Sequence, residues 1–274
     1  MTVAEQPVGR DGEPRGDPTI EYLSPVTEIS FPVEFYEVGE DRHFWMQWRL
    51  AVARRLFEAS GLALDRPLRA LDIGGGAGRF RDQIERATQW RVDMTDLNLP
   101  ALRMARPARG RTLYYDVTQA DPRLLGSYDV AFLFDVIEHV ESPGPLLRAA
   151  VEHLRPGGHL FLNVPALPAL YSAYDAVQGH VRRYSTGTLA AELASLPCRL
   201  EAVSYWGLGL VPLLGLRRLL VGRTPGPRTY RAGFQPPSPF ANQALKALMK
   251  VELALLGRPP LGTSVMAAAR RVAG

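Results

Sequence analysis

The feature that most constrains the fold is a short apolar segment that contains an acid and runs directly into a glycine turn. Residues 69–73 have the apolar content of a buried strand, glycines follow at positions 74, 76 and 78, and a helix is expected over residues 79–87. Glycine lets the backbone turn tightly and lets a ligand lie against bare amide groups near a helix N-terminus. The sequence therefore predicts a strand, a turn and a helix that hold a nucleotide-sized ligand.

The spacing of the glycines indicates which kind of nucleotide. A dinucleotide fingerprint has the order G-x-G-x-x-G, whereas here the third glycine comes one residue early and Arg79 occupies the expected position. A glycine turn alone is weak evidence. Asp72 just before it, and Asp96 at the end of the next apolar run, strengthen the interpretation as a cofactor site.

At this point the sequence resembles the class I S-adenosylmethionine-dependent methyltransferases, whose first motif is an acid followed by G-x-G-x-G. Residues 128–140 and 154–158 resemble later motifs of the same superfamily, so the resemblance spans about residues 68–165 in the correct order. It implies a Rossmann-like α/β fold with a seven-stranded sheet, mostly parallel with an antiparallel last strand, and helices on both faces. The implied cofactor is S-adenosyl-L-methionine, with S-adenosyl-L-homocysteine as product.

The alternation of strand and helix along the chain also predicts parallel βαβ units. Strands are expected at residues 69–73, 90–96, 111–115, 128–134, 159–164, 199–206 and 262–271, with a short helix at 99–106 and a turn at 155–158. Ligands bind at the carboxyl ends of the strands in such a sheet. Four acids fall there: Asp72, Asp96, Asp116 and Asp135.

These acids suit different parts of the cofactor. By position, Asp96 accepts hydrogen bonds from the ribose hydroxyls, and Asp116 accepts one from the adenine amino group. The resemblance places Asp72 at the methionine end. The alternative is that the acids only cap helices. The complete predicted cofactor set is Asp72, Gly74, Gly76, Gly78, Asp96, Leu97, Asp116, Val117 and Phe134.

The segment before the glycine turn is expected to cover the site. Residues 1–18 are polar and are predicted to be a disordered tail, and residues 19–61 form an N-terminal cover of a methyltransferase domain spanning 19–274. A helix is expected at 41–60, with Phe44, Trp48, Val52 and Leu56 as its apolar stripe. Its start resembles an H-F-W-x-x-x-R helix of a bacterial branch of the family, which makes Trp45 and Arg49 candidates for lining the acceptor pocket.

The acceptor chemistry is expected on two segments that carry histidines. His139 follows the fourth strand, and His180 lies in a stretch resembling the G-H-x-R-R-Y segment of the same branch; both are candidate bases. The accompanying candidates for binding the acceptor are Tyr174, Arg182, Arg183 and Tyr184. The arginines suit an anionic acceptor, or alternatively pair with surface carboxylates or cap a helix.

A divalent metal is a further option. Asp135, Glu138, His139 and His180 resemble the E-x-x-E-H…H set that binds a divalent ion in some O-methyltransferases, with Asp in place of the first Glu. Such an ion would lower the pKa of an acceptor hydroxyl. The alternative is that the Glu-His pair has no metal, as in many relatives.

The last part of the chain predicts a lid. Residues 207–261 lie between the sixth and seventh strands: an apolar run, 207–221, broken by glycine and proline and too short to span a bilayer, then a loop, 222–239, and an amphipathic helix, 241–256. The apolar content fits a hydrophobic acceptor, an interfacial surface or a homodimer face.

The composition of the chain bears on its partners, its cysteine chemistry and its location. The net charge is +4, but the arginines are dispersed and no aromatic-interleaved basic stripe is present, so no nucleic-acid partner is expected. Cys198 is the only cysteine, which excludes an internal disulfide and a cysteine-based zinc cluster. The polar N-terminus does not resemble a signal peptide, and the cytoplasm is the expected location.

The prediction is methyl transfer to a small molecule, in bacterial secondary metabolism such as antibiotic biosynthesis or on a glycoconjugate precursor. Transfer to oxygen is the first choice and transfer to carbon or nitrogen the alternative. An NAD(P)-dependent oxidoreductase is disfavoured by the glycine spacing and by the lack of a recognisable Tyr-x-x-x-Lys pair. A non-catalytic cofactor-binding scaffold is the other alternative.

Overall fold

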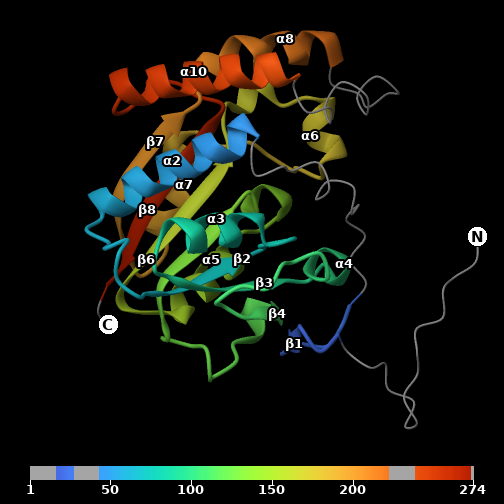
Figure 1. Cartoon of the computed structure of the whole chain (residues 1–274), viewed down its shortest axis with the longest axis vertical. Helices are drawn as coiled ribbons and strands as arrows, with labels where there is room; N and C mark the ends of the chain where they lie inside the picture. The colour runs from blue at the N-terminus through green and yellow to red at the C-terminus, as the bar shows by residue number, and fades with distance from the viewer. Residues whose placement is uncertain (1–16, 28–42, 222–237, 273–274) are drawn as a thin grey trace, which may run out of the picture.

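The computed structural model describes residues 17–27, 43–221 and 238–272, and its centre is an eight-stranded sheet with the order β1-β4-β3-β2-β5-β6-β8-β7 (Figure 1). Neighbouring strands are parallel except β8, which runs antiparallel to both β6 and β7. The strands are β1 (Glu21–Tyr22), β2 (Arg69–Ile73), β3 (Arg91–Asp96), β4 (Thr112–Tyr114), β5 (Tyr128–Phe134), β6 (Leu154–Pro165), β7 (Cys198–Trp206) and β8 (Ser264–Arg271). The predicted Rossmann-like α/β fold is confirmed, with eight strands rather than seven.

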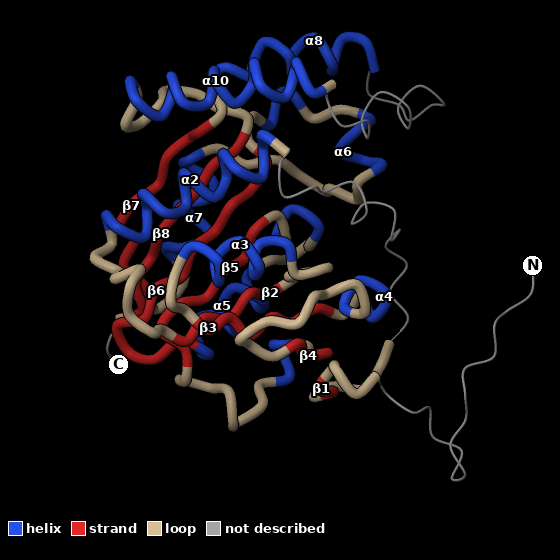
Figure 2. Tube along the Cα trace, viewed as in Figure 1, coloured by secondary structure: helices blue, strands red, loops and turns tan. Residues whose placement is uncertain are grey.

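Helices cover both faces of the sheet (Figure 2). On one face α2 (Phe44–Ala59) and α3 (Arg79–Ala87) pack in a core that includes Phe57, Phe80 and Phe132. On the other face α5 (Gly144–His153) and α7 (Thr186–Ala194) pack on Leu71 and Leu133. Successive residues of the buried strands thus alternate between two apolar cores, which explains their nearly continuous apolar sequences.

The eighth strand comes from the N-terminal segment. Glu21 and Tyr22 pair with Leu113 and Tyr114 at the edge of the sheet, and the rings of the two tyrosines stack 5.9 Å apart. A two-residue strand has no periodicity for sequence analysis to detect, so this segment was expected only to lie over the domain. The predicted disordered tail, residues 1–18, lies outside the described residues except for its last two.

The predicted turn at 155–158 is instead part of β6. Tyr128 pairs with Leu154, and Val130 pairs with His159. Residues 155–158 therefore form an irregular bulge opposite a single residue of β5, Asp129. Gly157 has a φ of 78°, a conformation that favours glycine. The Pro-Gly-Gly signal marks a real departure from regular pairing, but the strand resumes its ladder beyond it.

The apolar stripe of α2 differs from the predicted one. Trp48 is fully buried as expected, but the other fully buried apolar positions are Ala53 and Phe57, while Val52 and Leu56 are half-buried. The helix packs on the sheet and also contacts α10 (Pro239–Leu255). Because two neighbours cover it, its apolar surface is wider than a single stripe.

The predicted lid contains two helices. The stretch 207–221, which its glycines and proline were expected to break, forms the short 3-10 helix η4 (Leu208–Leu210) and α8 (Val211–Val221), because proline is tolerated in the first turn of a helix. Glu252 of α10 accepts hydrogen bonds from the backbone amides of Gly207 (2.7 Å) and Gly209 (3.0 Å), which fixes α10 to the end of β7. The loop expected at 222–239 lies outside the described residues up to 237.

The remaining helices are short: α4 (Leu99–Leu102), α6 (Ala173–Val177) and the 3-10 helices η1 (Val117–Gln119), η2 (Ile137–His139) and η3 (Pro168–Leu170). Most of them follow the carboxyl ends of strands, where they carry the candidate functional residues. In the described part of the chain, no helix is both long enough and apolar enough to cross a membrane.

Candidate functional site

The glycine turn has the geometry that the sequence predicts. Gly74, Gly76 and Gly78 have φ values of 72°, 54° and 74°. A Cβ atom on Gly74 would lie 2.6 Å from the Val136 side chain, so this position excludes other residues for steric as well as conformational reasons. Gly78 is the N-cap of α3 and offers no side chain to cap it. The first turn of α3 is therefore available to bind a ligand.

Asp72 lies at the end of β2 with a carboxyl that is almost inaccessible to solvent. Its side-chain atom Oδ2 has no hydrogen-bond partner among the described residues. Burial raises the pKa of Asp72 to about 7, against the opposing effects of Arg49 and Arg81. A buried acceptor without a partner is costly. The site therefore fits a ligand that brings a hydrogen-bond donor or a positive charge to Asp72.

Asp96 is held directly beside the glycine turn. Its Oδ2 atom accepts a hydrogen bond from the amide of Gly76 (2.8 Å), and its Oδ1 atom accepts one from the amide of Asn98 (2.7 Å). Burial raises its pKa, and these amides oppose the shift. Each carboxylate oxygen can accept a second hydrogen bond, so the predicted contact with ribose hydroxyls is compatible with this geometry. Leu97, the next residue, is half-buried.

Asp116 serves as a helix cap, the alternative considered from the sequence. Its Oδ1 atom accepts hydrogen bonds from the amide (2.9 Å) and hydroxyl (2.6 Å) of Thr118 at the start of η1, and its own amide donates to the Ser24 hydroxyl. Val117 packs its side chain in the core. Adenine binding by these two residues stays a prediction. Phe134 lies nearly buried, with its ring centroid 4.4 Å from that of Phe80.

A chain of partly buried polar contacts links α2 to β5, β6 and β7. Arg49 forms an ion pair with Asp135 (Nη1 to Oδ2, 2.5 Å), and Asp135 accepts a hydrogen bond from Asn163 (2.8 Å). Asn163 in turn accepts one from the indole of Trp206 (2.9 Å). Both carboxylate oxygens of Asp135 thus have partners other than the histidines, and its role as a metal ligand stays a prediction.

The guanidinium of Arg49 also has aromatic neighbours. It lies 4.8 Å from the ring centroid of Trp45 and 5.7 Å from that of Phe134. Trp45 and Arg49 are therefore brought to the same edge of the sheet as the cofactor candidates. Sequence analysis missed Asn163, although one amide inside an otherwise apolar strand is a signal, and it missed Trp206.

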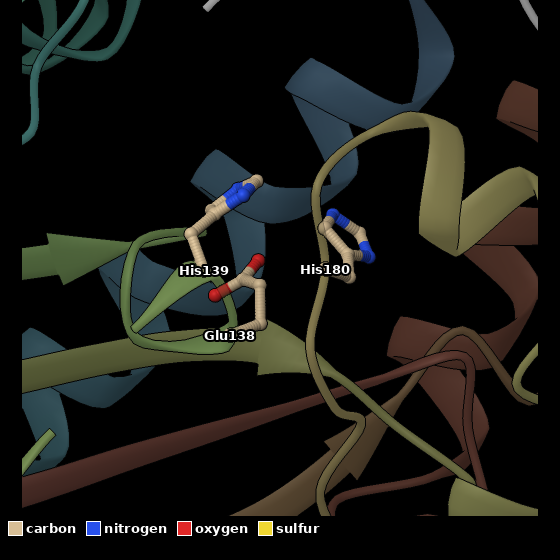
Figure 3. Close-up of side chains that lie close together, drawn as sticks. All are labelled: Glu138, His139 and His180. Carbon is tan, nitrogen blue, oxygen red and sulfur yellow. The ribbon is translucent and has the colours of Figure 1, made fainter. Parts of the chain in front are cut away.

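Glu138, His139 and His180 lie close together, as Figure 3 shows. One potential ligand atom from each lies within 4.8 Å of the others. Glu138 is 1% exposed, and neither of its carboxyl oxygens has a hydrogen-bond partner among the described residues. Burial raises the pKa of Glu138, and the nearby Asp135 adds to this effect. The cluster brings together three of the four residues predicted as metal ligands.

The two histidines are oriented by different partners. The Nδ1 atom of His139 lies 3.2 Å from the carbonyl oxygen of Gly179, and the ring centroids of the histidines are 4.9 Å apart. Burial, with a contribution from His180, lowers the pKa of His139 to about 4. At neutral pH the imidazole of His139 is therefore uncharged, and it is a weaker base than an ordinary histidine.

The loop that carries His180 is organised by Asp175. This buried carboxylate accepts hydrogen bonds from His180 Nδ1 (3.1 Å) and Arg183 Nε (2.7 Å) on one oxygen, and from the amide and hydroxyl of Ser172 on the other. Burial disfavours its charge, but the bond from His180 and the charge of Arg183 outweigh burial and lower its pKa to about 2. Asp175 thus fixes the position of His180.

The residues predicted to bind the acceptor therefore divide into two groups. Arg183 and Tyr184 are buried and bonded internally, Arg183 to Asp175 and Tyr184 to the carbonyl of Ile137, and their contact with an acceptor also stays a prediction. Arg182 is bonded to the carbonyls of Val140 and Glu141. Tyr174 lies under the guanidinium of Arg217, 4.0 Å from its ring centroid. Their contact with an acceptor stays a prediction.

Comparison with known proteins decides the family. A family model described as "Methyltransferase domain" matches residues 42–201, more than half of the chain. The chain belongs to this methyltransferase family. The prediction of a class I S-adenosylmethionine-dependent methyltransferase is confirmed, and the alternative of a nicotinamide-dependent oxidoreductase is set aside.

Individual relatives show the fold and the range of chemistry it carries. The methyltransferase is 31% identical over 146 residues to a ubiquinone biosynthesis O-methyltransferase of Ralstonia nicotianae, covering 48% of this chain and 60% of that one. The chain spans about half the length of the curated relatives it matches. A Haemonchus contortus phosphoethanolamine N-methyltransferase, solved with S-adenosylhomocysteine, has a TM-score of 0.52 at 18% identity over 84% of this chain and 53% of that one. The [4+2]-cyclase SpnF has a TM-score of 0.55 at 16% identity, with 86% of each chain covered.

Proposed function

We propose that this methyltransferase transfers the methyl group of S-adenosylmethionine to a hydroxyl oxygen of a small-molecule acceptor. The observation that carries the proposal is the buried carboxyl of Glu138, which has no hydrogen-bond partner among the described residues and lies beside the imidazoles of His139 and His180. Such a group at the carboxyl edge of the sheet is costly unless a ligand uses it. An acceptor hydroxyl is a donor of the required kind.

The proposed reaction is a direct displacement. The acceptor oxygen attacks the methyl carbon, a carbon–oxygen bond forms, and the carbon–sulfur bond of the sulfonium breaks to release S-adenosylhomocysteine. The hydroxyl proton goes to the cluster, where the raised pKa of Glu138 makes its carboxylate a stronger base than His139, whose pKa is lowered to about 4. The protein contributes mainly position and this proton acceptor.

The cofactor residues support the same arrangement. In the proposed complex the methionine end lies against Asp72 and the first turn of α3, and the ribose hydroxyls lie against Asp96. Both contacts use groups that the described structure holds beside the glycine turn. The carboxyl ends of β2, β3 and β5 then bring the sulfonium towards the turn that carries Glu138 and His139.

A divalent cation is compatible with the cluster. Glu138, His139 and His180 offer a carboxylate and two imidazoles at ligand spacing, and the unsatisfied oxygens of Glu138 fit a cation. A bound ion would lower the pKa of an acceptor hydroxyl. The residues perform the proton transfer described above without it, so the metal is a separate arm of the test.

The relatives favour oxygen over the alternatives. Several matching proteins are named ubiquinone biosynthesis O-methyltransferase, at about 31% identity, which supports an acceptor with a phenolic hydroxyl over the antibiotic or glycoconjugate precursor that the sequence suggested. The N-methyltransferase and cyclase among the structural neighbours share the fold alone, so transfer to nitrogen or carbon stays the alternative. We propose the cytoplasm as the site of the reaction.

The test is a methyl-transfer assay with isotopically labelled S-adenosylmethionine and a panel of matched acceptors. The acceptors are phenol, catechol, aniline and a phenyl ether, whose oxygen is blocked and whose ring carbons can still accept a methyl group. We expect labelled product from the hydroxyl compounds only, with the methyl group on oxygen by mass spectrometry. Each reaction is repeated with a chelator and with added Mg²⁺. Label on nitrogen or carbon would contradict the proposal, and loss of activity with the chelator would assign the cluster to a metal.

A further inference from the structure

The lid carries an outward apolar face that nothing in the described structure covers. We define the lid face as the outward residues of α8 and α10, both at one end of the molecule in Figure 1. On α8, Leu213, Leu216 and Leu219 are 52%, 52% and 81% exposed, whereas Leu214 is buried. The exposed residues recur at intervals of three along the helix, opposite its buried side. This pattern makes α8 amphipathic.

The second helix repeats the pattern. On α10, Phe240, Val251 and Leu255 are 85%, 53% and 75% exposed, and the buried residues are Met249 and Glu252. Alanines at positions 244, 247 and 254 lie between the large residues on the same side of the helix. The apolar surface of the lid face therefore runs along most of α10. A run of exposed large apolar residues of this kind marks an interaction surface.

The charge of the lid is one-sided. Residues 207–261 contain eight Lys and Arg but one acid, Glu252, whereas the rest of the chain has 24 basic and 27 acidic residues, a net charge of −3. Glu252 is buried and bound to two backbone amides, so it adds no negative charge to the surface. Both lysines of the chain, Lys246 and Lys250, are on α10, one turn apart. They lie at the border of its apolar side.

We propose that the lid face docks on an anionic lipid bilayer. An amphipathic helix with large apolar residues on one side and basic residues at the border lies in the interface of such a membrane, with its apolar side among the acyl chains. The lysines reach the phosphates while their alkyl stems cover apolar surface. The described helices do not span a membrane, so the association is peripheral.

The basic charge of the lid favours an anionic bilayer over a second copy of the chain or the tail of a bound acceptor. A second copy of the chain docked through the same face would bring two surfaces of the same sign together, and the described lid offers no surface carboxylate to pair with them. The tail of a bound acceptor would be enclosed by the protein, whereas these side chains point outward. An anionic bilayer supplies both an apolar layer and negative charge.

The test is co-sedimentation of the full-length protein with vesicles of phosphatidylcholine, alone or with 30% phosphatidylglycerol. We expect binding to the anionic vesicles that weakens with added salt, and little binding to the neutral ones. Lys246→Gln with Lys250→Gln should weaken the binding about 30-fold, because each basic residue near an anionic surface is worth about a factor of five to six. Leu219→Glu with Leu255→Glu should abolish it.

A matched control is Leu125→Glu, because Leu125 is also an exposed leucine but lies outside the lid. It should bind vesicles like the parent protein. Circular dichroism confirms that each variant is folded, as expected for exposed positions. Absence of binding to anionic vesicles, equal loss in the control, or a dimer that the Leu255→Glu variant dissociates without any vesicle binding would each overturn the proposal.

Discussion

The burial of Asp72 lowers the stability of the ligand-free protein, because its Oδ2 atom has no hydrogen-bond partner among the described residues. Its pKa is raised by burial from 3.8 to about 7, so between these values the folded protein keeps a proton that the unfolded chain has released. The unfolded state binds fewer protons in this window, and stability therefore falls as the pH rises from about 4 to 7. Above pH 7 the buried carboxyl is charged, and its full destabilising effect is present.

We expect Asp72→Asn to stabilise the ligand-free protein at pH 8 by about 4 kcal/mol, the free energy of a shift of about three pKa units, and to change stability little at pH 4. Urea unfolding at the two pH values measures the difference. The exposed Glu58→Gln serves as a control and should have no such pH dependence. If Asp72→Asn destabilises the protein at pH 8, the carboxylate has a structural partner and the interpretation fails.

Glu138 provides the second prediction at the residue scale. If the carboxyl acts on the acceptor, Glu138→Gln keeps its shape and removes its charge, and methyl transfer should fall by about 10²–10⁴-fold. Affinity for S-adenosylhomocysteine should be unchanged, and thermal stability should not decrease because a buried carboxyl is replaced by an amide. Product formation, titration calorimetry and thermal unfolding measure the three quantities.

The comparison for this variant is Glu141→Gln, three residues away and exposed. It should keep full activity. A loss of stability in Glu138→Gln that parallels its loss of activity would show that Glu138 supports the fold instead of the reaction.

At the scale of elements, α2 is joined to the sheet by the ion pair of Arg49 and Asp135. Removing one partner of a buried pair leaves an uncompensated charge and typically costs 3–5 kcal/mol. Because the Asp135 side chain is 28% exposed, we expect a smaller loss for Arg49→Met, about 2 kcal/mol in chemical unfolding. Asp135→Asn should recover part of it in the double variant.

Arg55→Met is the matched control for this prediction, because Arg55 lies on the same helix but is exposed. It should change stability by less than about 0.5 kcal/mol. A double-mutant cycle without coupling between Arg49 and Asp135 would contradict the role given to the pair.

Elements differed in how well the sequence predicted them, and the difference has physical causes. β2, α3 and β5 were predicted with their observed bounds because an apolar run, a glycine turn and an amphipathic helix give strong local signals. β1 depends on pairing with a distant strand, so local sequence carries little of it. The bulge at 155–158 also depends on its neighbour, since the same residues in isolation favour a turn.

The residues of the candidate site also differ in how well the sequence predicts where they lie. The acids at the strand ends and the pair of histidines were predicted, because residue type and position along the sheet determine where they lie. The burial of Arg183 was not predicted, since it depends on Asp175, a partner that the sequence does not single out. The sequence alone does not show whether an arginine is buried or exposed, because its burial depends on the residues that surround it.

At the scale of the whole molecule, the proposed ligand site draws on segments far apart in the chain. Arg49 comes from the N-terminal cover, the glycine turn follows β2, Asp96 ends β3, and the lid is fixed to β7 by Glu252. We therefore expect a ligand bound at this edge to contact several of these elements at once. Its binding should stabilise the molecule as a unit.

The size of this stabilisation follows from mass action. At a concentration 100 times its dissociation constant, S-adenosylhomocysteine should stabilise the folded protein by about 2.7 kcal/mol, which corresponds to a rise in Tm of about 5–10 °C for a domain of this size. NADH at the same concentration should give no shift. Asp96→Ala removes the acceptor expected to bind the ribose, and also frees the amide of Gly76, so its own Tm without ligand is the reference. A shift that survives in Asp96→Ala would place the cofactor elsewhere on the sheet edge, whereas its loss would join the glycine turn, the acid and the cofactor in one site.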